Sequence, residues 1–194
     1  ARAGENETSS FCKGCGHADT FNALIEAIKP FGQGRMFSDI GCYTLAALPP
    51  FNAISSCVDM GASVTMAIGA ADAGLFPSVA VIGDSTFTHS GMTGVLDAVC
   101  KNSPVTVIIS DNLTTGMTGG QKSPATGRIE KICSGLGVAP DHIRTIVPLR
   151  KNHEENVRAM KEEFEYRGVS VIVSSRECIQ TASRRRKAEV SEEQ

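Results

Sequence analysis

The sequence predicts a doubly wound α/β fold, with a mainly parallel sheet and helices on both faces. Three apolar runs, VAVI, VTVII and VSVIV, are continuous rather than alternating, as strands buried on both faces require. Helical patterns separate these runs, and such alternation is typical of parallel sheets. We expect residues 1–10 to be a polar lead-in, residues 11–180 to form one domain, and residues 181–194 to be a charged tail that is disordered or frayed.

Two helices and two strands are predicted in the first half of the domain. Residues 18–29 place apolar side chains at helical spacing, and Pro30 follows as a stop. A short strand at 35–38 leads into a Gly-Cys turn. Residues 62–74 are rich in small side chains, which lets a helix pack closely on a sheet. The next strand, 78–82, contains the run VAVI.

The second half continues the alternation. A helix at 91–101 would connect strand 78–82 to a strand at 105–110 by a right-handed crossover, which would make the two strands neighbours. A polar, Gly-rich loop follows. After it we expect a helix at 128–136, a strand at 143–147, an amphipathic helix at 153–167 and a strand at 169–174.

Charge and hydropathy exclude some classes of function. The formal net charge is −2, so the overall balance indicates neither nucleic acid nor an anionic membrane as a partner. The basic run 184–187 lies among glutamates, which favours a solvated tail. No stretch reaches the roughly 18 apolar residues of a membrane span, and no signal peptide opens the chain. We therefore expect a cytoplasmic protein, and the first residue, Ala1, suggests a piece of a longer one.

The seven cysteines favour a reducing compartment and thiols or metal ligands over disulfides. Cys12 and Cys15 form a CxxC in FCKGCGH, Cys42 lies in DIGCYT, and Cys178 lies in SSRECI. A CxxC alone fits an iron–sulfur cluster, a zinc site or unligated thiols. The remaining cysteines have apolar or small neighbours and are expected to be packing residues: Cys57, Cys100 and Cys133.

Oxygen-bearing side chains follow two of the predicted strands. Asp84 comes after VAVI and Gly83, and Asn112 comes after VTVIISD. The carboxyl ends of parallel strands share one edge of a sheet, so these side chains can converge there. Mg²⁺ prefers one or two protein oxygens together with phosphate oxygens. Gly83 allows close backbone approach, and a helix N-terminus near Gly91 would face the phosphate. The sequence thus predicts a metal-bridged diphosphate site.

The spacing from Gly83-Asp84-Ser85 to Asp111-Asn112 resembles the thiamine diphosphate motif, in which GDG is followed by a similar gap and an Asn. The resemblance implies that Mg²⁺ is bound by Asp84, Asn112 and the backbone carbonyl of Thr114. Ser85 replaces the usual second glycine, which is a modest departure because serine is also small.

Other motifs narrow the resemblance. DNLTTGMTGGQKSPATG and FCKGCGH are similar to the cofactor loop and the CxxCG opening of the 2-oxoacid:ferredoxin oxidoreductases. DIGCYTLAALPP, CVDMGAS and GDSTFTHSG resemble the indolepyruvate branch, specifically the C-terminal thiamine-binding part of its large subunit. The resemblance covers about residues 11–180 and implies the thiamine diphosphate-binding fold, as a domain that binds the diphosphate.

The resemblance also implies site residues. Cys12, Cys15, Cys42 and Cys178 match positions that hold a [4Fe–4S] cluster in related enzymes, with zinc or free thiols as alternatives. His89 is the candidate catalytic residue, as a proton donor, or else a helix cap. The expected cofactor-binding residues are Gly16, His17, Gly41, Cys42, Gly61, Gly83, Asp84, Ser85, Asn112, Thr114, Thr118 and Gly119.

The implied reaction is oxidative decarboxylation of a 2-oxoacid, with indolepyruvate or another arylpyruvate favoured, to an acyl-coenzyme A, with electrons passed to ferredoxin. The implied partners are a pyrimidine-binding domain of the same enzyme, a smaller subunit and a second copy in a homodimer. Without the pyrimidine-binding domain, which supplies a glutamate, we expect the chain to be inactive. Two alternatives remain: a subunit of a non-oxidative thiamine-dependent decarboxylase, and a non-catalytic domain that keeps the site as a subunit interface.

Overall fold

The computed structural model describes residues 11–192 of the chain. The predicted lead-in, residues 1–10, lies outside this range. The described part contains six strands in one parallel sheet, in the order β2-β1-β3-β4-β8-β7. These strands are β1 (Met36–Ser38), β2 (Ser56–Cys57), β3 (Ser78–Gly83), β4 (Val105–Asp111), β7 (Ile143–Ile146) and β8 (Ser170–Ser175). The predicted parallel sheet is therefore confirmed.

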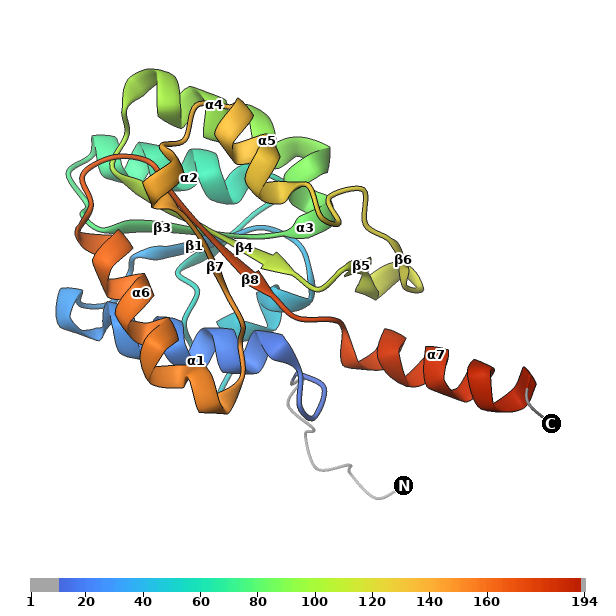
Figure 1. The fold of residues 1–194 in the computed structure, drawn as a ribbon. Helices are drawn as coiled ribbons and strands as arrows, with labels where there is room; N and C mark the ends of the chain where they lie inside the picture. The colour runs from blue at the N-terminus through green and yellow to red at the C-terminus, as the bar shows by residue number, and fades with distance from the viewer. Residues whose placement is uncertain (1–10, 193–194) are drawn as a thin grey trace, which may run out of the picture.

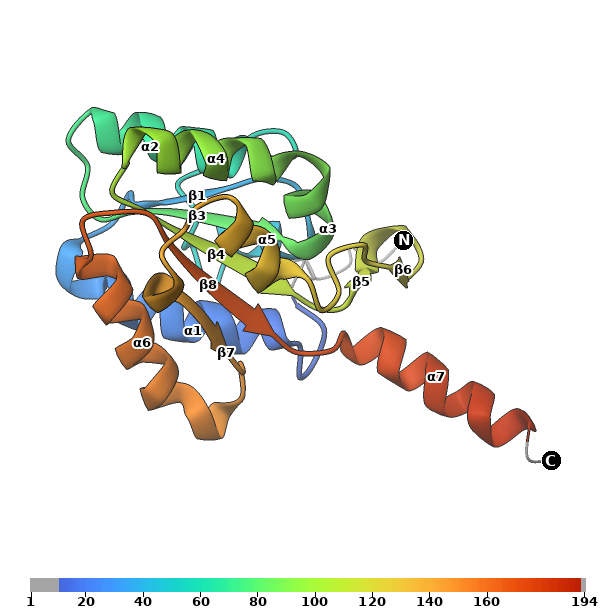
Figure 2. The same cartoon turned by 45° about the horizontal axis from the view of Figure 1, so that its top comes forward.

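Helices cover both faces of this sheet, as the doubly wound prediction requires (Figure 1). On one face lie α2 (Ala62–Asp72), α4 (Met92–Lys101) and α5 (Ile129–Gly135). On the other face lie α1 (Gly16–Ile28) and α6 (His153–Glu165), which pack against each other as well as against the strands (Figure 2).

The central strands explain the continuous apolar runs. In β3, Ala80 and Ile82 belong to the core beneath α2 and α4, whereas Val79 and Val81 belong to the core beneath α1 and α6. Successive side chains of a strand point to opposite faces, so a strand between two helical layers needs an apolar residue at nearly every position. All six residues of β3 and all seven of β4 are buried.

Several short elements lie in segments that the sequence analysis left as loops. The 3-10 turns are η1 (Lys29–Phe31), η2 (Cys42–Ala47), η4 (Gly116–Thr118), η5 (Pro140–His142) and η6 (Arg150–Asn152). A small antiparallel ribbon pairs β5 (Thr114–Thr115) with β6 (Gln121–Lys122). Such short pieces carry too few residues for a periodic signal.

The helix predicted to begin near residue 91 starts earlier. Helical structure begins with α3 (Asp84–Thr86), continues through the π-helical segment η3 (Phe87–Gly91) and passes into α4. The preceding Gly83 has extended backbone angles and serves as the N-cap. The predicted start at Gly91 was wrong because neither glycine nor proline interrupts residues 84–90. The free N–H groups at the helix start therefore lie beside Asp84.

The tail is also corrected. We expected residues 181–194 to be disordered or frayed, but α7 (Ile179–Glu192) continues as a helix and projects away from the sheet (Figure 1). This segment has no glycine or proline and contains several alanine, arginine and lysine residues, which favour helix. Arg185 pairs with Glu177 at 2.8 Å, just before the helix. Residues 193–194 lie outside the described range. Within that range no helix is both long and apolar enough to cross a membrane.

Candidate cofactor-binding site

The candidate site lies at the carboxyl edge of β1, β3 and β4. Strand β1 stands between β2 and β3. The chain therefore adds β2 next to one edge of β1 and then adds β3 next to its other edge, so the direction of strand addition reverses at β1. Ligand sites of open parallel sheets form at such a reversal, beyond the carboxyl ends of the strands. Gly83 of β3 is paired in register with Ser110 of β4, which brings the segments that follow both strands together.

Asp84 provides a buried oxygen at this edge. It is the first residue of α3, and one carboxylate oxygen, Oδ1, accepts the Ser85 backbone N–H at 2.5 Å. The other oxygen, Oδ2, is buried and has no hydrogen-bond partner among the described residues. Burial, together with the nearby Asp111 carboxylate, raises the pKa of Asp84 from 3.8 to about 6. A buried carboxylate with one free oxygen fits a site for a cation.

Replacing Asp84 with asparagine should stabilise this chain in the absence of ligands at pH 7.5. The folded state binds the Asp84 proton more tightly than the unfolded state does. The protonated carboxyl therefore contributes its full stabilisation below pH 3.8, and this contribution is lost as the pH rises through about 6. A pKa difference of this size corresponds to about 3 kcal/mol of unfolding free energy. Urea unfolding should therefore show a gain for Asp84→Asn at pH 7.5 and a much smaller one at pH 4. Equal gains at both pH values would contradict the raised pKa of Asp84. The control is Asp97→Asn, on the exposed side of α4, which should show no such difference between the two pH values.

Asn112 and Thr114 line the same cleft as Asp84. Asn112 follows β4 directly, and its side-chain Oδ1 accepts the Thr114 backbone N–H at 3.1 Å. The Thr114 hydroxyl in turn donates to the carbonyl of Gln121 at 2.9 Å, across the β5–β6 ribbon. The structure thus brings together the three residues that the sequence analysis named as Mg²⁺ ligands.

Tyr43 lines the cleft and is held by the buried Asp39, and the sequence analysis missed both residues. A Cβ atom at Gly83 would lie 2.7 Å from the Tyr43 ring, so only glycine fits there without moving the ring. The Tyr43 hydroxyl donates to the buried Asp39 carboxylate, which also accepts the Gly61 backbone N–H at 3.0 Å and the Ser63 hydroxyl at 2.9 Å. Burial raises the pKa values of Asp39 and Tyr43. Asp39 directly follows β1, as Asp84 follows β3, and this shared position is the signal that could have identified it.

A second cavity contains the cysteines. Cys12, Cys15, Cys42 and Cys178 all line it. The Cys15 N–H donates to the Cys12 carbonyl at 2.9 Å, which closes the CxxC turn. The Cys178 N–H donates to the carbonyl of Asn112 at 3.0 Å, which holds the segment between β8 and α7 against the segment after β4. Burial and the neighbouring thiols raise the pKa values of Cys15 and Cys42.

The four thiols share one cavity, for which the sequence analysis left an iron–sulfur cluster, a zinc site and free thiols open. In the part of the chain that the structure describes, no three histidine, cysteine or acidic side chains are grouped so as to hold a single metal ion. A zinc ion needs its sulfur ligands about 2.3 Å from one point.

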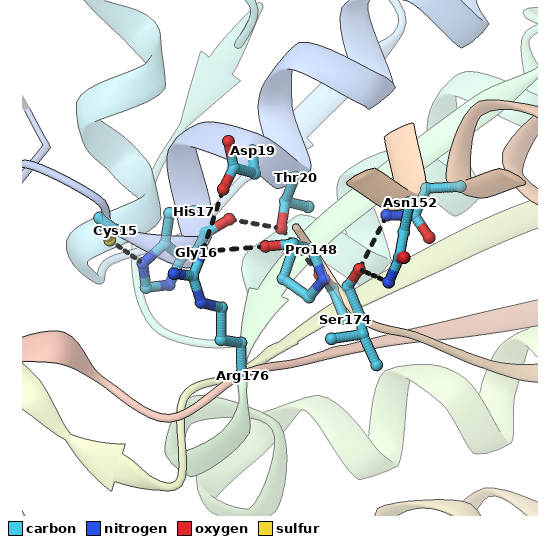
Figure 3. Close-up of polar contacts among 11 residues, drawn as sticks. Cys15, Gly16, His17, Asp19, Thr20, Pro148, Asn152, Ser174 and Arg176 are labelled. Atoms are coloured by element: carbon cyan, nitrogen blue, oxygen red, sulfur yellow. Dashed lines mark hydrogen bonds and ion pairs between the residues drawn. The ribbon is translucent and has the colours of Figure 1, made fainter. Parts of the chain in front are cut away.

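Arg176 fixes the segment that carries the CxxC, and the sequence analysis did not identify it. Its guanidinium donates to Asp19 and to the Pro148 carbonyl, both at 3.0 Å (Figure 3). Its aliphatic part lies 3.2 Å from the point that a Cβ on Gly16 would occupy. This arginine therefore connects the start of α1 to the ends of β7 and β8, and Gly16 leaves room for it.

The cleft and the cysteine cavity share a wall. The residues that line both are His17, Cys42, Ser110, Asn112 and Gly116. Asn112, one of the three predicted metal ligands, thus lies between the cleft and the cysteine cavity. The Ser110 hydroxyl in this wall is buried and has no hydrogen-bond partner among residues 11–192. Burial lowers the pKa of His17 to about 4, so its ring is neutral near pH 7.

The other candidate residues are distributed unevenly. Gly41, Gly83, Ser85 and Thr118 line the cleft, and Gly16 lines the cysteine cavity. Gly61, His89 and Gly119 line neither cavity. His89 lies exposed on η3, so its catalytic role stays a prediction, as do the contacts expected of the two glycines. Of the three packing cysteines, Cys133 is buried, Cys57 is partly exposed and Cys100 is exposed.

Comparison with known proteins identifies the family of the chain. Residues 39–174 match the model of the C-terminal TPP binding domain of thiamine pyrophosphate enzymes. The chain belongs to this family. The matched range contains Asp84, Asn112 and Thr114, whereas Cys12, Cys15 and Cys178 lie outside it.

Curated relatives extend the match beyond this thiamine pyrophosphate-binding domain. The indolepyruvate oxidoreductase subunit IorA of Archaeoglobus fulgidus is 34% identical over 92% of this chain, and that of Pyrococcus horikoshii is 34% identical over 87%. The chain spans about 30% of the length of these relatives. The predicted membership of the 2-oxoacid:ferredoxin oxidoreductase family, nearest the indolepyruvate branch, is confirmed.

A solved structure shares the fold. The chain superposes on the 2-oxoglutarate:ferredoxin oxidoreductase of Magnetococcus marinus with a TM-score of 0.75, covering 90% of this chain and 66% of that one. At 18% identity, this likeness supports the architecture alone.

Proposed function

We propose that this domain holds the diphosphate of thiamine diphosphate, through Mg²⁺, in an enzyme that oxidatively decarboxylates a 2-oxoacid, indolepyruvate or another arylpyruvate, to an acyl-coenzyme A. Ferredoxin is the proposed electron acceptor. The observation that carries the proposal is the wall shared by two cavities, one with metal-type oxygen ligands and one with four thiols.

The residues of the cleft fit the cofactor. Asp84 offers a buried carboxylate oxygen without a hydrogen-bond partner among the described residues, and Asn112 offers an amide oxygen beside it. Together with the Thr114 carbonyl they make an all-oxygen set, which suits Mg²⁺. The N–H groups at the start of α3 add a site for negative charge. Thiamine diphosphate, when bound, supplies the electron sink for loss of carbon dioxide.

The cysteine residues fit an iron–sulfur cluster. Cys12, Cys15, Cys42 and Cys178 supply the four thiolates that a [4Fe–4S] cluster needs. Cys42 and His17 stand in the wall between the cluster position and the cofactor cleft. An electron leaving the cleft would cross only this wall. That arrangement favours an oxidative function over the alternative, a non-oxidative thiamine-dependent decarboxylase, which has no use for four thiols in one cavity.

The rim of the cleft supports the proposed partners. Ile40, Met60 and Met117 line the cleft and are 46%, 41% and 65% exposed. Exposed apolar side chains around a polar cleft are typical of a surface that another protein covers. We assign this rim to the pyrimidine-binding domain of the same enzyme, which would close the cleft and exclude water. A smaller subunit and a homodimeric assembly complete the proposal.

The test is an anaerobic activity screen of the full-length protein in complex with its smaller subunit. Indolepyruvate, phenylpyruvate, pyruvate and 2-oxoglutarate are offered with coenzyme A and a viologen dye, and acyl-coenzyme A and reduced dye are measured. The proposal expects the two aryl substrates to give the highest kcat/KM. Carbon dioxide release without dye reduction would instead establish the non-oxidative alternative. No turnover of any substrate, with cofactor bound, would favour a non-catalytic domain.

A further inference from the structure

A buried histidine contacts one of the four cysteines directly. His17 lies in the first turn of α1 and is 7% exposed. Its ring nitrogen Nδ1 is 3.2 Å from the Cys15 sulfur, within hydrogen-bond distance for sulfur (Figure 3). His17 also lines both the cysteine cavity and the cofactor cleft.

The packing around His17 holds this geometry. The ring stacks on Phe11, with centroids 5.8 Å apart, and lies tilted 6.3 Å from Tyr43. These aromatic contacts restrict the rotation of the ring, and helix α1 fixes its backbone. The nitrogen that faces Cys15 is therefore determined by packing on several sides.

The direction of the hydrogen bond follows from the chemistry of the thiol. As a free thiol, Cys15 could donate to Nδ1 or accept from it. As a cluster ligand, Cys15 is a thiolate and carries no proton, so the contact persists only if Nδ1–H donates to sulfur. This step rests on the proposed function, because it requires the cluster.

We propose that His17 is a positioning residue for the cluster, donating a hydrogen bond from Nδ1 to the Cys15 sulfur and raising the reduction potential of the cluster. Hydrogen bonds to ligand sulfurs stabilise the more negatively charged, reduced state. A net hydrogen bond of typical strength changes the one-electron equilibrium about fivefold, which corresponds to about 40 mV. His17 thereby makes the cluster a better acceptor of electrons from the cofactor cleft.

Redox titration of the full-length complex under anaerobic conditions, followed by EPR, tests the proposal. The signal of this cluster is the one that Cys178→Ser removes. His17→Phe keeps an aromatic ring but has no donor, and should lower the potential. His17→Asn places an amide near the position of Nδ1, and should restore most of the difference. His153→Phe, on α6 beside Glu26, removes another histidine and should change nothing.

A second measurement needs no substitution at the site. With histidine labelled by nitrogen-15, pulsed EPR of the reduced wild-type cluster should detect coupling to one ring nitrogen. His17 is the only one of the four histidines that lines the cavity. A potential unchanged in His17→Phe, or absent nitrogen coupling in wild type, would overturn the role of His17 while leaving the cluster intact. Iron and sulfide missing from the wild-type complex would instead refute both the cluster and the role of His17.

Discussion

Replacing Asp84 with alanine should abolish magnesium-dependent binding of thiamine diphosphate. Asp84 contributes the buried carboxylate oxygen that has no hydrogen-bond partner among the described residues. In the proposed function, this oxygen would bind the Mg²⁺ through which the protein holds the diphosphate. Loss of a charged ligand should weaken cofactor binding by more than about 100-fold. Calorimetry on the full-length protein, with thiamine diphosphate and saturating Mg²⁺, measures this directly.

Two further variants separate binding from folding. Asp97→Ala removes an exposed carboxylate from α4 and should bind the cofactor as the wild type does. Asp84→Asn keeps the shape of the side chain and should be more stable without ligand at neutral pH, as argued above, yet still fail to bind. If Asp84→Ala bound the cofactor with an affinity within threefold of the wild type, Asp84 would not be a ligand of the metal ion.

Replacing Cys178 with serine should leave cofactor binding intact but remove electron transfer. The serine side chain keeps the size of the residue, and the backbone hydrogen bond from residue 178 to Asn112 does not need the sulfur. A [4Fe–4S] cluster that loses one of its four thiolates is expected to be lost or strongly altered. Viologen reduction by the full complex should fall by more than about 100-fold, with iron and acid-labile sulfide falling in parallel.

The matched control is Cys100→Ser, because Cys100 is exposed on α4 and lies outside the cysteine cavity. It should retain full iron content and activity. Zinc in place of iron in the anaerobically purified wild type would contradict the proposed iron–sulfur cluster and would show that the four cysteines form a zinc site. Full viologen reduction by Cys178→Ser would show that electrons leave the cofactor by another route.

Much of the fold was predictable because burial on both faces of a sheet leaves a local signature. The runs in β3, β4 and β8 were recognised as strands. The structure extends β3 and β4 by one residue at the carboxyl end and shifts β8 by one residue. The pairing of Gly83 with Ser110 then places Asp84 and Asn112 at one edge, as the parallel arrangement required. The helix errors lay at the start of α3 and along α7, and the missed strands, β2, β5 and β6, have only two residues each.

The amino-acid sequence by itself determined the longer strands, most helices, the placement of Asp84 and Asn112 at strand ends, and the family, since each depends on neighbouring residues or on fixed spacing. Only the tertiary structure decided that Cys15, Cys42 and Cys178 share a cavity, that Tyr43 requires glycine at position 83, and that Arg176 connects two layers. The residues concerned are far apart in the sequence, from 27 positions for Cys15 and Cys42 to 163 positions for Cys15 and Cys178. Strand order and crossover direction, which no local pattern specifies, bring such segments together.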